Sequence, residues 1–108
     1  MKRLLTLTVL LLVLAPPSWA TNYYVDTTGN DTTGDGSSGA PWRTIQKSVE
    51  SGSPVTAGDT VYVRDGTYTA TSGGRTVLIN GTGTPQGTSG NPVTIKAENC
   101  HAAKIVTP

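Results

Sequence analysis

The stretch Gly58–Tyr68, with the sequence GDTVYVRDGTY, decides the fold class of this 108-residue chain. A Gly-Asp turn leads into the alternating run Thr60–Val63, and a second turn at Asp65 and Gly66 opens another short aromatic strand. Short strands between Gly and Asp turns, with few helix-forming residues around them, are typical of all-β folds. The stretch therefore predicts an all-β protein that is built from small units.

Similar short strands are predicted on both sides of this stretch. Tyr23–Val25 precedes it, while Thr76–Ile79 and Val93–Ala97 follow it and Ile105 begins a further candidate. Several of these strands carry two apolar residues two positions apart, which places both on one face of the strand. The pairs recur at irregular spacing, as in stacked units that are joined by loops of variable length.

The segment Trp42–Glu50 is the one convincing helical stretch in the sequence. Trp42, Ile45 and Val49 are spaced so that all three lie on one face of a helix, and Gly52 can end that helix in a left-handed conformation. Such a short helix is unstable by itself in water. Its apolar face is therefore expected to pack on another apolar surface.

Residues 1–20 have the features of a signal peptide. A basic start precedes a leucine-rich run, and Ser18-Trp19-Ala20 offers small residues where a signal peptidase cuts. The alternative is an uncleaved membrane anchor, but the apolar run is shorter than the roughly 20 residues that a membrane-spanning helix needs. We expect cleavage before Thr21, export to the extracellular space or the periplasm, and no membrane association after cleavage.

The charge and the cysteine content limit the partners of the mature chain. It keeps seven acidic residues, and six basic ones once Lys2 and Arg3 are taken from the eight in the whole chain. It therefore lacks the basic surface of a nucleic-acid-binding protein. Cys100 is the only cysteine, which excludes an internal disulfide. Two alternatives stay open for it: a small buried hydrophobic residue, which we favour, or a free thiol that can pair between chains.

Taken together, these segments resemble the N-terminal part of secreted right-handed parallel β-helix proteins, the pectate-lyase-like superfamily. The matching motifs occur in the order of the family, and Ser48 stands where its helix motif usually has Ala. The motifs are an opening strand at Tyr23–Asp26, a capping helix at Ala40–Lys47, a first coil at Gly58–Val63 and Gly66–Tyr68, and a following strand at Gly90–Ala97.

The resemblance implies an all-β fold, namely the first coils of a right-handed parallel β-helix behind a short N-terminal capping helix. Residues 1–20 are then the signal peptide, 21–57 the first strand, loop and capping helix, and 58–108 the first coils. Family members run for many coils, so we interpret the chain as a truncated N-terminal fragment whose uncapped last coil promotes self-association. The alternative fold is a small unrelated sandwich with one incidental helix.

The resemblance also implies a protein that acts on polysaccharide, as a lyase or a hydrolase. Lyases of the family use Ca²⁺ for β-elimination on acidic polysaccharide, but their catalytic groups lie on later coils. The resemblance therefore assigns no catalytic, cofactor-binding or metal-binding residue in this chain, and we expect the fragment to be inactive by itself. The alternative is a non-catalytic secreted or cell-surface protein that binds glycans or has a structural role, so the enzyme question stays open.

Individual polar residues have simpler explanations than catalysis. Asn30, Asp31 and Asp35 could supply oxygen ligands to Ca²⁺, but side-chain hydrogen bonds of turns account for the same residues. The sequence leaves open whether Asn30 and Asn80, which begin glycosylation triplets, are modified. The other candidates are predicted as turn or surface residues: Asp59, Asp65, Lys96, Lys104 and His101.

Overall fold

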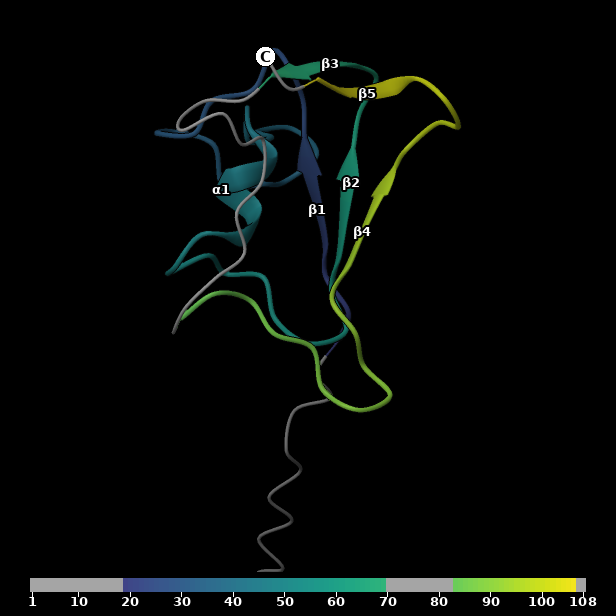
Figure 1. Cartoon of the computed structure of the whole chain (residues 1–108). Helices are drawn as coiled ribbons and strands as arrows, with labels where there is room; N and C mark the ends of the chain where they lie inside the picture. The colour runs from purple at the N-terminus through teal and green to yellow at the C-terminus, as the bar shows by residue number, and fades with distance from the viewer. Residues whose placement is uncertain (1–18, 70–82, 107–108) are drawn as a thin grey trace, which may run out of the picture.

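The computed structural model of the chain describes residues 19–69 and 83–106. These residues form, in chain order, the elements β1 (Asn22–Val25), α1 (Ile45–Val49), β2 (Thr60–Val63), β3 (Gly66–Thr69), β4 (Thr94–Ala97) and β5 (Ala103–Val106) (Figure 1). β1, β2 and β4 form one sheet in that order, and β3 pairs with β5 in a second sheet. Residues 1–18 of the predicted signal peptide and the predicted strand Thr76–Ile79 lie outside the described residues.

Neighbouring strands are parallel in both sheets. In the first sheet Val61 lies opposite Tyr23 on one side and Ile95 on the other, and in the second sheet Tyr68 lies opposite Ile105. Parallel neighbours need a crossover connection and cannot be joined by a hairpin turn. The chain runs from β2 into β3 and later from β4 into β5. The segment β4–β5 therefore stacks on the segment β2–β3, with β4 beside β2 and β5 beside β3 (Figure 1). This arrangement is that of β-helix coils and excludes the antiparallel sandwich.

The core lies on the inward side of the first sheet. Val25, Val61 and Val63 are at most 5% exposed, whereas Tyr24 and Tyr62, which alternate with them, are only half-buried. This alternation follows from the two-residue period of a strand. The core also contains Trp42, Ile45, Val49, Val55 and Tyr68.

The helix is shorter than the sequence predicts. α1 begins after Thr44, whose backbone is extended and whose side-chain oxygen accepts a hydrogen bond from the N–H of Lys47. Trp42 precedes the helix, because its backbone pairs with the opening strand: its N–H donates to the carbonyl of Tyr24 at 3.0 Å, and its carbonyl accepts from Asp26 at 2.8 Å. The expected helix start at Trp42 is therefore wrong, and the capping role of α1 stays a prediction.

The three apolar residues of this segment are buried as predicted, although Trp42 does not lie on the helix. Trp42, Ile45 and Val49 are each 2% exposed. Ser48 is also fully buried, and its hydroxyl donates to the carbonyl of Ile45 at 2.6 Å. This hydrogen bond lets a serine replace the alanine that is usual in the motif, since a buried hydroxyl needs a partner.

The turn between β4 and β5 corrects one expectation. Cys100 is exposed there, so the favoured buried position is wrong and the free-thiol alternative remains. His101, next to it, is exposed and has a left-handed backbone with a φ of 65°, which fits the predicted turn. Within the described residues, no helix combines the length and the apolar character needed to cross a membrane.

Candidate functional site

The outward face of the first sheet carries a row of two aromatic rings and one cation, which we call the ladder: Tyr24, Tyr62 and Lys96. The register places these residues opposite one another on β1, β2 and β4. The two tyrosine rings stack with centroids 5.6 Å apart and an interplanar angle of 20°. The ammonium of Lys96 lies 5.1 Å from the centroid of the Tyr62 ring. Strands about 4.8 Å apart bring in-register side chains into such contact.

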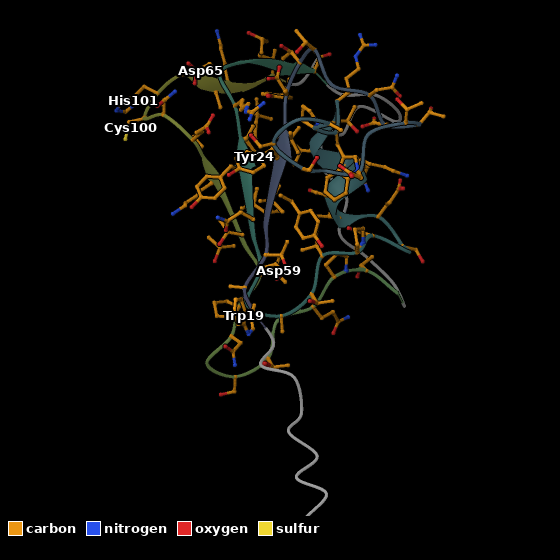
Figure 2. All side chains as sticks on the ribbon, turned by 180° about the vertical axis from the view of Figure 1, so that it is seen from behind. Trp19, Tyr24, Asp59, Asp65, Cys100 and His101 are labelled. Atoms are coloured by element: carbon orange, nitrogen blue, oxygen red, sulfur yellow. The ribbon has the colours of Figure 1, made fainter. Side chains whose placement is uncertain are left out.

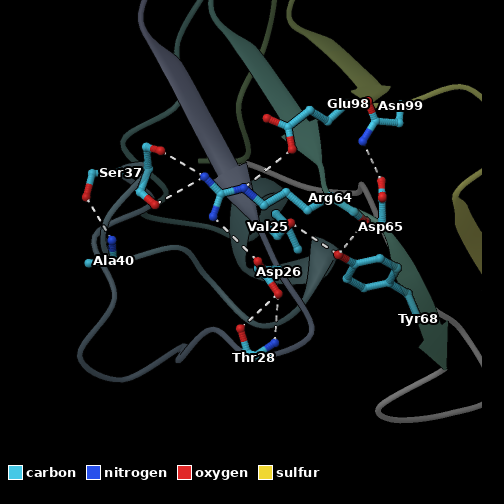
Figure 3. A network of polar contacts seen from close by, with 11 residues as sticks. Val25, Asp26, Thr28, Ser37, Ala40, Arg64, Asp65, Tyr68, Glu98 and Asn99 are labelled. Carbon is cyan, nitrogen blue, oxygen red and sulfur yellow. Dashed lines mark hydrogen bonds and ion pairs between the residues drawn. The ribbon is translucent and has the colours of Figure 1, made fainter.

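A second row, of charged residues, lies two positions further along the chain, directly after β1, β2 and β4 end. Arg64 stands between two carboxylates, with Nη1 3.5 Å from Asp26 Oδ2 and Nε 3.5 Å from Glu98 Oε2 (Figure 3). Its Nη2 donates to the carbonyl and the hydroxyl of Ser38, and its guanidinium lies 4.9 Å from the centroid of the Tyr24 ring. Arg64 is therefore held in place, and its positive charge is balanced by the two carboxylates. Its guanidinium packs on the ring of Tyr24, the first residue of the ladder.

Asp26 is held in its charged form by its neighbours. The backbone N–H of Thr28 donates to Oδ1 at 2.9 Å, and this bond, more than the guanidinium of Arg64, keeps the pKa of Asp26 below its usual range. A carboxylate with a lowered pKa gives up a proton readily and does not serve as a general acid near neutral pH. The charged row is therefore a structural support.

Lys96 has a different environment from Arg64. Its side chain is exposed, and no carboxylate of residues 19–69 and 83–106 lies within ion-pair distance of its ammonium. The ammonium contacts the face of Tyr62 and retains its capacity to bind an anion. The ladder thus offers two phenol rings with their hydroxyls, followed by one available positive charge.

A cleft of about 360 Å³ lies between the start of α1 and β3. Hydroxyl-bearing residues line most of it, and Arg43 is its charged lining residue; the lining is Thr27, Arg43, Thr44, Ile45, Thr67, Tyr68 and Thr69. The hydroxyl of Tyr68 lies 3.1 Å from the carbonyl oxygen of Val25 and 2.9 Å from that of Arg64. Among the described residues that line it there is no carboxylate or histidine, the side chains most often used for acid–base chemistry.

Because the Tyr68 hydroxyl is buried, we expect the stability of the fold to fall at alkaline pH. Burial raises its pKa from 10.0 to about 12, so the stability that its neutral form contributes is present below about pH 10 and is lost as the pH rises through about 12. We expect urea unfolding at a series of pH values to show this decline in the wild type and a smaller decline in Tyr68→Phe. Tyr62→Phe is the matched control and keeps the wild-type decline. Equal declines in Tyr68→Phe and the wild type would contradict the assignment.

Comparison with known proteins places the fold. A family model described as "Protein of unknown function (DUF1565)" matches residues 27–81, about half of the chain. The chain belongs to the DUF1565 family. A solved structure titled "Rhamnogalacturonan lyase" matches it with a TM-score of 0.56 and 26% sequence identity, over 80% of this chain and 21% of the lyase. The chain thus spans about a fifth of that lyase. No curated protein sequence matches it.

These matches confirm the predicted resemblance to the right-handed parallel β-helix of the pectate-lyase-like superfamily. The DUF1565 match covers the Gly-rich loop, α1 and the pair β2 and β3. It therefore includes Tyr62 and the charged residue Arg64. Tyr24 and Lys96, the other two residues of the ladder, lie outside the matched range.

The loop residues that were considered as calcium ligands act as hydrogen-bond acceptors. Asn30 Oδ1 accepts from the backbone N–H groups of Thr32 and Thr33, and Asp35 Oδ1 accepts from Ser37. Asp31 accepts from residues at the start of α1. Within the described part of the chain, no three His, Cys, Asp or Glu residues are grouped to hold a metal ion. These bonds fit the hydrogen-bonding explanation that the sequence offers for the three residues.

The structure separates the other candidates. Asp59 and Asp65 lie at opposite ends of β2, as Figure 2 shows, so they form no pair of carboxylates around one bond. Asp65 is exposed and accepts from Nδ2 of Asn99 at 2.9 Å. Lys96 and Lys104 are both exposed, as expected, but on different sheets. The ladder was not predicted from the sequence, because its three residues become neighbours only through the register of the three strands.

Proposed function

We propose that this chain supplies the first coils of a secreted β-helix protein that acts on polysaccharide, and that its ladder binds the polymer. The observation that carries the proposal is the row of Tyr24, Tyr62 and Lys96 on the outward face of the first sheet. It is supported by the similarity to a structure titled "Rhamnogalacturonan lyase".

The direction of the ladder suits a linear polymer. Its members lie side by side on three neighbouring strands, so the row runs across the strands, along the direction in which the coils stack. A sugar chain that lies along this direction meets one phenol after another. The hydroxyls can exchange hydrogen bonds with sugar hydroxyls, and the half-buried rings can provide apolar contact.

The charge of the ladder favours an acidic polymer over a neutral one. Arg64 is paired with two carboxylates, Asp26 and Glu98, so the charged row carries one negative charge overall and adds no positive charge to the face. Lys96 is the cation that is left to pair with a sugar carboxylate. We therefore propose uronic-acid-containing polysaccharide as the substrate class of the protein.

We place the lyase or hydrolase chemistry, with any Ca²⁺ that it needs, in further coils of such a protein. Glycoside hydrolysis needs two facing carboxyl groups, whereas Asp26, Asp31 and Asp59 all accept hydrogen bonds from their own surroundings. The same observation favours a second candidate function, a non-catalytic secreted protein that binds or organises glycans. The chain by itself is expected to be inactive under both proposals.

Binding to immobilised polymers tests the proposal. The exported wild-type chain is expected to bind polygalacturonate more tightly than a neutral galactan, and added salt should weaken the difference. Lys96→Gln should lower the affinity for polygalacturonate about tenfold, or ~1.4 kcal/mol, because it removes the available charge. Lys104→Gln, an equally exposed lysine on the second sheet, is the matched control and should bind like the wild type.

Two further results separate the alternatives. Tyr62→Ala should weaken binding to both polymers, because it removes the central ring of the ladder. Ultraviolet absorbance of unsaturated products should stay at background with polygalacturonate and Ca²⁺. Equal affinities of Lys96→Gln and Lys104→Gln would defeat the ladder as the binding site, and steady product formation by this chain would defeat the placement of catalysis.

A further inference from the structure

Asp59 is a buried carboxylate whose hydrogen-bond donors, within the described part of the chain, are neutral groups of Thr21 and Thr56. Asp59 is only 4% exposed. Oδ2 accepts from the backbone N–H of Thr56 at 2.8 Å and from its hydroxyl at 3.1 Å, and Oδ1 accepts from the backbone N–H of Thr21 at 2.8 Å. Among the described residues, no Lys, Arg or His forms an ion pair with it. Burying a carboxylate without a cation is costly.

Thr21 marks the point where the chain enters the fold. It directly precedes β1, and its carbonyl accepts a hydrogen bond from the N–H of Thr60 at 3.0 Å. The two residues before it are outside the core: Trp19 is 78% exposed and Ala20 is also exposed. Figure 2 shows Trp19 and Asp59 at the same end of the first sheet. The peptide bond between Ala20 and Thr21 thus lies at an exposed position directly before β1. The nitrogen of that bond donates a hydrogen bond to Asp59.

We propose that proteolytic removal of residues 1–20 completes this site, because it turns the nitrogen that Asp59 already binds into an α-ammonium. A signal peptidase adds water across the peptide bond between Ala20 and Thr21. The C–N bond breaks, Ala20 leaves as a carboxylate, and Thr21 keeps a protonated amino group. Asp59 then faces a cation at hydrogen-bond distance, in place of a neutral amide.

The consequence is a mature chain that is more stable than its precursor. A charge-assisted hydrogen bond is roughly twice as strong as a neutral one, and here it fastens the start of β1 to the residue that precedes β2. The carboxylate of Asp59 is therefore a receiving site for the new N-terminus. This inference rests on cleavage before Thr21 and is independent of the proposed polysaccharide binding.

A comparison of four chains tests it. One pair begins at Thr21 or at Ala20, so that the nitrogen of Thr21 is an ammonium in the first and an amide in the second; the other pair carries Asp59→Asn in addition. Both starts lack Trp19, so fluorescence of Trp42 reports urea unfolding in all four. We expect the unfolding equilibrium constant to be about tenfold smaller for the Thr21 start than for the Ala20 start, and equal for the two starts with Asp59→Asn.

A second measurement uses the full precursor in an exporting host, so that processing takes place on the natural chain. N-terminal sequencing should give Thr21 as the first residue, and Asp59→Asn should shorten the half-life under limited proteolysis several-fold. A Gly-Ser insertion between Ala20 and Thr21 should also shorten it, by less than Asp59→Asn does, and should cause no further loss when it is added to Asp59→Asn. Equal stability of the two starts with Asp59 intact, or additive losses from the insertion and Asp59→Asn, would overturn the proposal.

Discussion

Replacement of Trp42 by alanine is expected to lower the free energy of unfolding by roughly 3–5 kcal/mol, the range for truncating a buried aromatic residue. Trp42 is 2% exposed, and its ring stacks on Tyr23 with centroids 5.3 Å apart and an interplanar angle of 13°. Its Nε1 donates to the carbonyl of Gly34 at 3.1 Å. The change leaves a cavity between the opening strand and the Gly-rich loop and removes the donor for that carbonyl.

The size of the cavity predicts the order of the control variants. Trp42→Phe keeps most of the apolar volume and should lose less stability than Trp42→Ala. Ile105→Ala truncates a side chain that is 58% exposed and should change the free energy of unfolding by less than about 1 kcal/mol. Far-ultraviolet circular dichroism during urea unfolding measures all three without the tryptophan signal. A loss in Trp42→Ala no larger than in Ile105→Ala would contradict the assigned core.

Asp31→Ala is expected to cost roughly 2–4 kcal/mol, because hydrogen bonds to a charged group each contribute about 1.5–3 kcal/mol and are not additive. The carboxylate accepts from the backbone N–H groups of Arg43 and Thr44 at 2.7 and 3.1 Å, and from the hydroxyl of Thr44 at 2.7 Å. It thus ties the Gly-rich loop to Thr44, the residue directly before α1.

Asp35→Ala is the matched control for this change. Asp35 is exposed and accepts local hydrogen bonds from Ser37, so its loss should lower the free energy of unfolding much less than Asp31→Ala does. Thermal unfolding with and without Ca²⁺ distinguishes a hydrogen-bond anchor from a metal ligand. We expect Ca²⁺ to leave the wild type unchanged. A melting temperature that rises with Ca²⁺ in the wild type and not in Asp31→Ala would contradict the anchor.

Local patterns predicted the strands well and the helix start badly. β2 was predicted with its observed bounds, because Val61 and Val63 alternate with polar or aromatic residues between turns. Trp42 fitted the helical period equally well, but its backbone is used in pairing with Tyr24 and Asp26. That pairing joins segments about twenty residues apart in the chain, and the helical period of neighbouring residues carries no information about it.

The candidate site was the least predictable part for the same reason. Tyr24, Tyr62 and Lys96 are ordinary strand residues one by one, and they become a ladder only when the register of three strands is known. Asp59 was predicted as a turn former, and its hydrogen bonds to Thr56 fit that role. Its burial and its contact with Thr21 depend on the distant opening strand. Local sequence patterns therefore did not predict the register between distant strands.

The most direct test of the central claim, that the ladder binds acidic polysaccharide, is a nuclear magnetic resonance titration of the isotope-labelled exported chain with a short oligogalacturonate. We predict that the largest chemical-shift changes fall on Tyr24, Tyr62 and Lys96, that they saturate with one affinity, and that Lys96→Gln weakens this affinity about tenfold. Changes centred on the cleft beside Arg43 and Thr67, or no changes at concentrations that saturate binding to the polymer, would contradict it.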